Sequence, residues 1–200
     1  MQQKTGILLI DPLNEFLHAD GKLYPLLKSS IDAADTIQNL HKFIETARKA
    51  NIPIFYCQHQ LIEDGHYDRW NHMTKSQRGI NTSGAFRVGT FGGQIYEGMG
   101  PQKSNGDVVV SRHWNSSSFA NTDLDYQLRQ QDITHLVCAG MVANTCLETT
   151  ARYAVEFKDA TAGFSVQLHD AAKDIIWPTI VDQVTTVQEW ASSLEQETKL

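Results

Sequence analysis

The chain has 200 residues, of which 41% are hydrophobic, and it carries a formal net charge of −6. Its length and apolar content predict one globular domain over residues 1–200 with a full hydrophobic core. The negative charge and the lack of a basic patch argue against nucleic-acid binding, and no apolar run is long enough to cross a membrane, so we expect neither kind of partner.

In the first half of the chain, two apolar runs flank one helical stripe. Residues 5–10 read TGILLI, a run that ends at Asp11-Pro12 and is typical of a strand buried on both faces. Ser30 is a good N-cap for a helix over residues 30–50. Residues 52–57 (IPIFYC) form the second predicted strand. A strand, a helix and a strand in this order favour a right-handed parallel crossover.

The second half begins with a long connection, residues 58–106, which is rich in Gly, His and aromatic residues. Long loops of compact domains are usually functional or disordered, and the rings here favour a pocket wall or an oligomer contact. Further predicted elements follow in order: strands over residues 107–112 and 133–138, a helix opened by Asn144 and running to about residue 155, a strand over 164–168, a helical segment over 175–180, an edge strand over 181–185 and a last helix capped by Thr186.

Three reactive side chains follow predicted strands: Asp11 after the first, His113 after the third and Cys146 after the fourth. The carboxyl ends of parallel strands share one edge, where open α/β sheets bind ligands. Backbone N–H groups at a helix start lower the pKa of a thiol, so Cys146 is a candidate nucleophile, although most free cysteines are small buried hydrophobes. A thiol, a carboxylate and a group able to carry positive charge are the components of nucleophilic acyl chemistry.

The motifs around these residues resemble those of the isochorismatase-like superfamily of cysteine hydrolases. LLIDPLNEF is similar to the superfamily's strand followed by Asp-x-Gln-Asn-x-Phe, with Asp11 and Phe16 matching. GMVANTCL is similar to Gly-Val-x-Thr/Ala-Asn-x-Cys-Val, with Gly140 and Cys146 matching. The resemblance is collinear from about residue 5 to residue 170.

This resemblance implies a three-layer α/β/α fold with a mostly parallel sheet of about six strands, usually in an oligomer, so we expect a homo-oligomer. The superfamily's catalytic triad is Asp, Lys and Cys, which assigns Asp11 and Cys146. Its lysine stands six residues before the Phe of Lys-x-x-x-Ser-x-Phe, and in HWNSSSF that position holds His113. Histidine is mostly neutral at pH 7 unless its pKa is raised. Arg112 could supply the charge only from a bulged strand, so His113 is the expected substitute.

The resemblance also implies a cis peptide bond between Met141 and Val142. The N–H groups of Val142 and Cys146 would then form an oxyanion hole. We expect aromatic side chains to contact the small-molecule substrate, and the candidates are Phe16, Trp70, Trp114 and Phe119.

The presence of Cys146 favours hydrolysis of a C–N bond in a small amide or ureide, through a thioester with Asp11 as general base and acid. Two alternatives stay open. Superfamily members named isochorismatases often lack the cysteine and cleave the vinyl ether of isochorismate with the Asp as acid. The missing lysine also allows a catalytically degenerate binding or scaffold protein, although such a protein would need neither Asp11 nor Cys146.

We expect no metal and no cofactor. Nicotinamidases of this superfamily bind zinc or iron through an Asp-x-His pair and a further His, and residues 58–60 contain no such pair. His59, His66 and His72 match no standard ligand spacing, so nicotinamide is not an expected substrate.

Cysteine usage and the chain start bear on location. The three cysteines are an odd number without metal-type spacing, which predicts free thiols in a reducing compartment. The first residues show no signal-peptide pattern, so we expect a cytoplasmic location, although export without a signal peptide would leave no mark.

Overall fold

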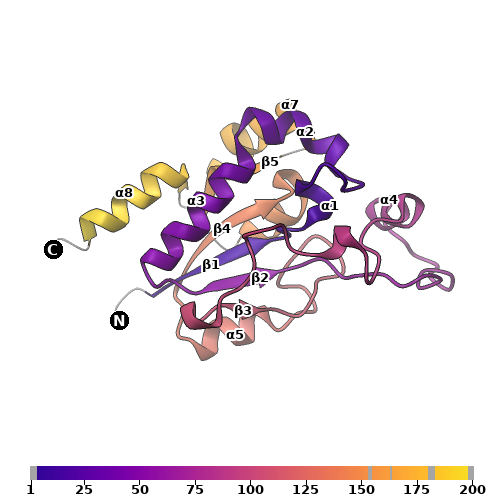
Figure 1. The fold of residues 1–200 in the computed structure, drawn as a ribbon, viewed down its shortest axis with the longest axis horizontal. Helices are drawn as coiled ribbons and strands as arrows, with labels where there is room; N and C mark the ends of the chain where they lie inside the picture. Colours follow the sequence, from indigo (N-terminus) through magenta and orange to yellow (C-terminus); the bar gives the residue numbers. More distant parts are fainter. Residues whose placement is uncertain (1–3, 153–154, 163, 180–182, 198–200) are drawn as a thin grey trace.

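Six parallel strands form the centre of the molecule (Figure 1), in the order β3-β2-β1-β4-β5-β6. The structure is a computed structural model that describes residues 4–152, 155–162, 164–179 and 183–197. Within these ranges the strands are β1 (Thr5–Ile10), β2 (Ile54–Cys57), β3 (Val108–Val109), β4 (His135–Met141), β5 (Val155–Ala162) and β6 (Val184–Thr185).

Helices cover both faces of this sheet. In Figure 1, α2, α3 and α8 lie on one side of the strands and α5 lies on the other. The helices are α1 (Asn14–Leu17), α2 (Tyr24–Ala33), α3 (Thr36–Lys49), α4 (Lys75–Ser83), α5 (Leu124–Gln130), α6 (Glu148–Ala151), α7 (Val166–Ala171) and α8 (Val187–Glu197), with shorter helical turns η1 (Phe91–Gly93), η2 (Lys103–Asn105), η3 (Ala143–Leu147), η4 (Ala172–Ile176) and η5 (Trp177–Thr179). The predicted three-layer α/β/α fold is confirmed.

The pleat of β1 explains the two-sided core. Side chains alternate along a strand, so Ile7 and Leu9 pack into the cluster beneath α2 and α3, whereas Leu8 and Ile10 pack into the cluster beneath α5. All four are 0% exposed. The unbroken apolar run therefore reflects burial on both faces, as parallel sheets require.

The predicted helix over residues 30–50 is two helices. α2 begins earlier, at Tyr24, and Ser30 is buried within it and donates its hydroxyl to the Leu27 carbonyl instead of capping a helix. The break follows Ala34, because Asp35 adopts a left-handed conformation with a φ of 47°. A helical stripe passes through this break unchanged, so apolar spacing alone gives no sign of it.

The helix after Cys146 is also shorter than predicted. α6 ends at Ala151, and Val155 begins β5 instead of a further helical turn, while residue 154 lies outside the described residues. The predicted strand over residues 164–168 is wrong, because Ser165 caps α7 by accepting from the Leu168 N–H at 3.1 Å. Thr186 caps α8 as predicted, since its hydroxyl accepts from the Glu189 N–H at 3.1 Å.

The long connection contains a helix that sequence reasoning missed. Thr74 and Gln77 form a reciprocal capping box at the start of α4, and Gly84 closes the helix in the left-handed region with a φ of 65°. The pattern Thr-x-x-Gln followed later by Gly carries both end signals. It was overlooked because the helix between them has few apolar residues.

No helix in the described part of the chain is long and apolar enough to cross a membrane.

Candidate functional site

Three strand ends bring Asp11, His113 and Cys146 together at one edge of the sheet. A carboxylate oxygen, a ring nitrogen and the sulfur of these residues all lie within 4.8 Å of one another. Asp11 and His113 are 0% exposed and Cys146 is 8% exposed. The structure therefore places the three candidate catalytic residues in one closed, buried group.

Asp11 leaves β1 through a left-handed turn with a φ of 48°. Its carboxylate oxygen Oδ1 accepts from the His59 N–H at 2.6 Å and lies 3.2 Å from Nε2 of His113. The second oxygen, Oδ2, is buried and has no hydrogen-bond partner within normal distance among the described residues. A buried acceptor without a donor is costly, and one that persists requires an explanation. Oδ2 is the atom of this group that is free to take a proton.

A bulge presents His113 to Asp11. The N–H of Val110 donates to the Tyr56 carbonyl, and the next bond of this ladder runs from the His113 N–H to the Gln58 carbonyl. Between these two bonds the chain advances three residues on the His113 side but only two on the Gln58 side. The segment that leads to His113 therefore contains one extra residue. Because of this residue, His113 occupies the register position that Arg112 would take in a regular ladder.

The bulge moves Arg112 away from the Asp11 carboxylate, the opposite of the expectation that a bulged strand would bring it there. Its guanidinium donates to the His59 carbonyl at 2.7 Å and to Oε1 of Gln58 at 2.9 Å. Arg112 is therefore a fixed positive charge behind the site, and His113 is the residue that contacts Asp11 directly.

Both ring nitrogens of His113 face oxygen acceptors. Nε2 faces Asp11 Oδ1 at 3.2 Å and Nδ1 faces the Asn115 carbonyl at 2.5 Å. A neutral imidazole has one donor, whereas the imidazolium has two and can satisfy both acceptors. Burial lowers the pKa of His113, but the charge and hydrogen bond of Asp11 and the Asn115 carbonyl outweigh it and raise the pKa above its ordinary value. The geometry thus favours a cation where the related motif has lysine.

The Asp11 carboxylate is stabilised as an anion by the same contacts. Burial acts to raise its pKa, but the charge and hydrogen bond of His113, together with the charge and backbone N–H of His59, hold it below its ordinary value. Asp11 and His113 therefore form a buried ion pair.

The thiol of Cys146 differs from the sequence-based expectation. Cys146 lies in η3, the first helical turn after β4, but burial raises its pKa well above the ordinary value, and the charge and hydrogen bond of Asp11 raise it further. Hydrogen bonds with the Thr145 side chain and the Val142 backbone lower the pKa and do not offset this. The resting thiol is protonated, so it needs a base when it attacks, and Asp11 is adjacent.

The chain between β4 and Cys146 is tightly constrained. Gly140 has a φ of 125°, and a Cβ atom at this position would lie 2.0 Å from the Ile10 carbonyl oxygen, so only glycine fits. The Met141-Val142 peptide bond is cis. The Val142 carbonyl accepts from the N–H groups of Thr145 and Leu147 at 3.0 and 3.3 Å. The roles of the Val142 and Cys146 N–H groups as an oxyanion hole stay a prediction.

His59 is a member of the site that sequence reasoning weighed only as a metal ligand. Besides its N–H bond to Asp11, its ring stacks on Phe86 with centroids 4.5 Å apart and meets His113 edge-on at 5.4 Å. Phe86 is in turn fixed by the carboxylate of buried Glu15, which accepts its N–H at 2.9 Å. The signal available in the sequence was position, since His59 follows β2 at the same sheet edge.

The candidate substrate-binding rings are divided among three places. The rings of Trp70 and Trp114 pack together with centroids 5.5 Å apart, and Trp114 directly follows His113 in sequence. Phe16 is buried and packs edge-on against Phe86 at 5.3 Å, and Phe119 packs on the core cluster that includes Cys146. Trp70 and Trp114 are thus the pair with a partly open surface.

The other candidate metal ligands do not assemble. Within the described ranges, the one set of three or more possible ligand groups is Asp11, His113 and Cys146. His66 instead stacks on Trp114 at 5.1 Å, and His72 is exposed.

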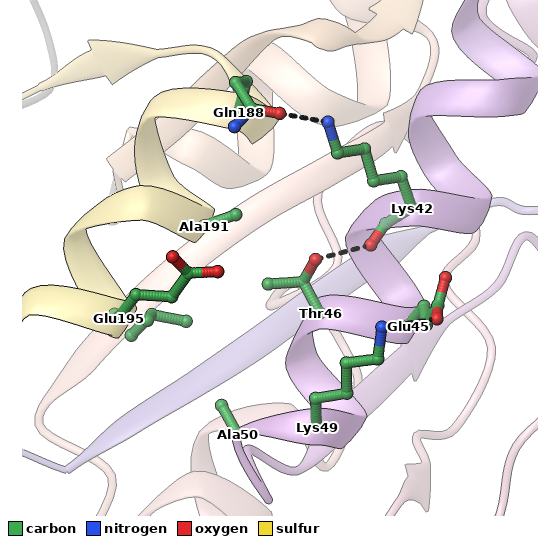
Figure 2. Close-up of a pocket in the computed structure, with 9 residues that line it drawn as sticks. Lys42, Glu45, Thr46, Lys49, Ala50, Gln188, Ala191 and Glu195 are labelled. Carbon is green, nitrogen blue, oxygen red and sulfur yellow. Dashed lines mark hydrogen bonds and ion pairs between the residues drawn. The ribbon is translucent and has the colours of Figure 1, made fainter. Parts of the chain in front are cut away.

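A surface hollow of about 410 Å³ lies elsewhere, between α3 and α8 (Figure 2). There Lys42 donates to Gln188, and Lys49 and Glu195 add charges of opposite sign. Helix α3 runs back along the sheet and ends at Lys49, just before β2 begins at Ile54, so this end of α3 lies at the opposite sheet edge from Asp11. The hollow is therefore separate from the triad.

Comparisons with known proteins agree with this geometry. The family model described as the isochorismatase domain matches residues 5–189. An uncharacterized isochorismatase family protein of Bacillus subtilis (strain 168), YddQ, is 30% identical over 173 residues, covering 83% of this chain and 82% of that protein. Ureidoacrylate amidohydrolase RutB of Rhizobium rhizogenes is 28% identical over 192 residues, covering 91% of this chain and 75% of that protein.

A solved structure gives the same likeness in three dimensions. The cysteine hydrolase from Pseudomonas syringae pv. phaseolicola 1448A superposes with a TM-score of 0.78 at 26% identity, covering 96% of this chain and 93% of that one.

Proposed function

Since this chain belongs to the isochorismatase family, a family of hydrolases, we propose that it hydrolyses the C–N bond of a small amide or ureide through a thioester on Cys146. The observation that carries the proposal is the buried Asp11–His113 ion pair, with the free oxygen of Asp11 in a group that also holds the Cys146 thiol. The likeness to a ureidoacrylate amidohydrolase supports a ureide-type substrate.

The first half of the proposed reaction forms the thioester. Asp11 takes the thiol proton as the sulfur of Cys146 attacks the substrate carbonyl carbon, and the oxyanion is stabilised by the N–H groups of Val142 and Cys146. The protonated Asp11 then gives its proton to the leaving nitrogen as the C–N bond breaks. The high pKa of the resting thiol makes this proton transfer necessary.

The second half regenerates the thiol. Asp11 removes a proton from a water molecule that attacks the thioester, and the sulfur leaves as a thiol by recovering that proton. His113 keeps Asp11 ionised at the start of each half. The pair is sealed from solvent, so a substrate must be small and must enter past Cys146, the one member with exposed surface.

A substrate panel tests the proposal. The purified chain is assayed with ureidoacrylate, N-carbamoyl amino acids, simple aliphatic amides and isochorismate, and hydroxylamine is added to intercept an acyl-enzyme. We expect ammonia release from one of the nitrogen substrates, and in the trapping reaction a hydroxamate from an amide or a hydroxyurea from a ureide. Turnover of isochorismate alone would support vinyl-ether hydrolysis, and the absence of turnover across the panel would favour a binding role.

The pH profile is expected to report the ion pair. The pKa of Asp11 is lowered and that of His113 is raised. The charged pair therefore persists from below about pH 3.9, the ordinary pKa of Asp, to above about pH 6.5, the ordinary pKa of His. Activity should fall on the alkaline side as His113 loses its proton. Burial and the Arg112 cation lower the pKa of His113, whereas Asp11 and the Asn115 carbonyl raise it and prevail.

Substitutions at His113 test that assignment. His113→Lys should retain activity and move the alkaline limb upward, because lysine holds its proton to about pH 10.4. His113→Gln should lose most activity, and His135→Lys, at an exposed position on β4, serves as the matched control. An unchanged profile in His113→Gln would remove His113 from the triad. A chelator is included in all of these assays.

A further inference from the structure

The ion pair and thiol also form a set of metal ligands. The carboxylate, imidazole and thiol donors of Asp11, His113 and Cys146 lie within 4.8 Å of one another, and Oδ1 of Asp11 is 3.2 Å from Nε2 of His113. Zinc binds S, N and O donors at about 2.0–2.3 Å, so neighbouring ligands of a tetrahedral ion lie about 3.3–3.7 Å apart. A small contraction of this group would reach that spacing.

The surroundings of the His113 and Asp11 donors also suit an ion. The Nδ1 atom of His113 donates to the Asn115 carbonyl at 2.5 Å, which leaves Nε2 as the nitrogen directed at Asp11. Metal-binding histidines are usually oriented by such a bond from the other nitrogen. The Oδ2 atom of Asp11 is buried and unpartnered among the described residues, which supplies a free carboxylate donor.

The residue at position 113 decides whether this set exists. Lysine there would be a fixed ammonium charge that repels a cation, whereas histidine offers a nitrogen lone pair. The bulge that follows β3 and the Arg112 contacts to Gln58 and His59 are what place the imidazole beside Asp11.

We propose that a thiophilic divalent cation such as Zn²⁺ binds Asp11, His113 and Cys146 and inhibits the enzyme by occupying the thiol. Binding displaces one proton from sulfur and one from Nε2 to solvent, and the thiolate and the neutral imidazole donate their lone pairs to the ion. No redox step is involved. The inhibition rests on the proposed hydrolase function, whereas binding of the ion does not.

The binding test uses Co²⁺ as a spectroscopic substitute. The purified metal-free chain is titrated with Co²⁺ while the thiolate-to-cobalt charge-transfer absorption in the near ultraviolet is recorded. We expect one ion per chain, with the absorption lost in Cys146→Ala and affinity reduced more than about 100-fold in His113→Lys. Circular dichroism establishes that both variants are folded.

Two variants serve as controls for other ligands. Cys57→Ala removes a neighbouring buried thiol and His72→Ala removes an exposed imidazole, and both should bind Co²⁺ like the wild type. Binding that survives in His113→Lys, or that is lost in Cys57→Ala, overturns the proposal.

The activity arm separates the two proposals. Zn²⁺ should abolish turnover in the wild type, and a chelator should restore it. Charge-transfer absorption without turnover of any panel substrate would reject the hydrolase proposal and keep the metal site. Turnover without this absorption would reject the metal site, and stimulation by Zn²⁺ would reject the inhibitory role.

Discussion

Replacing Cys146 by alanine is expected to reduce amide turnover by about 10⁶-fold, the scale seen when a hydrolase loses its nucleophile. Without the sulfur no thioester forms, and Asp11 is left without a thiol to deprotonate. The substitution removes one buried sulfur atom and introduces no larger group that would have to be accommodated. The fold should therefore persist with a modest loss of stability. Steady-state assays with the best panel substrate measure the effect.

The matched control is Cys138→Ala, which removes the same buried side chain from β4, at a position outside the group of Asp11, His113 and Cys146. It should keep wild-type kcat and lose only stability in a thermal melt. A Cys146→Ala protein that still hydrolyses the amide at the wild-type rate would contradict the thioester mechanism. If it instead turns over isochorismate normally, Asp11 acts as an acid in vinyl-ether cleavage and the cysteine is not required.

The meeting of the triad could be predicted from sequence because it follows from topology. Parallel strands place their carboxyl ends at one edge, and Asp11, His113 and Cys146 each follow a strand. In the sheet order, β1 lies beside β4, and β3 lies beyond β2, so Cys146 approaches Asp11 from the neighbouring strand and His113 approaches it across the end of β2. Nothing about side-chain detail was needed for this step.

The properties of the triad depended on contacts that no local pattern contains. The helix start predicts a lowered pKa for Cys146, but burial and the neighbouring Asp11 raise it. The alternation of a regular strand gives no sign of the extra residue before His113. The position of His59 depends on stacking against Phe86, which lies 27 residues later in the chain and has a strained φ of 54°.

The secondary-structure errors have the same origin. The division between α2 and α3 depends on a single left-handed residue, Asp35, in a continuous apolar stripe. The predicted helix runs to about residue 155, where β5 begins, and no strand is predicted over the rest of β5, because its pairing partner, β4, lies outside any local window. Helix α4 was different, because its capping signals were present in the sequence.

Replacing Asp11 by asparagine is expected to reduce kcat by about 10²–10⁴-fold, the usual contribution of a general acid–base group. Asparagine keeps the shape and accepts the His59 N–H, but it cannot carry a proton between the thiol and the leaving group. It also removes the charge that raises the pKa of His113, so that ring should become neutral. The measurement is kcat and KM across pH: protonation of Asp11 should produce an acidic limb in the wild type, and this limb should disappear in the variant.

Asparagine is a better probe here than alanine. Asp11 is fully buried with a φ of 48°, a conformation that Asn tolerates far better than Ala, and alanine would leave the His59 N–H and the His113 ring without their acceptor. We therefore expect Asp11→Ala to lose stability as well as activity.

Asp35→Asn provides the matched control for this last substitution. Asp35 has a φ of 47°, makes no side-chain cap bond and is exposed at the start of α3, so the same chemical change occurs in the same backbone conformation. It should leave kcat, KM and the pH profile unchanged. If Asp11→Asn also retains wild-type kcat and its acidic limb while Asp35→Asn behaves normally, another group must carry the proton, because Oδ2 of Asp11 is then unnecessary for turnover.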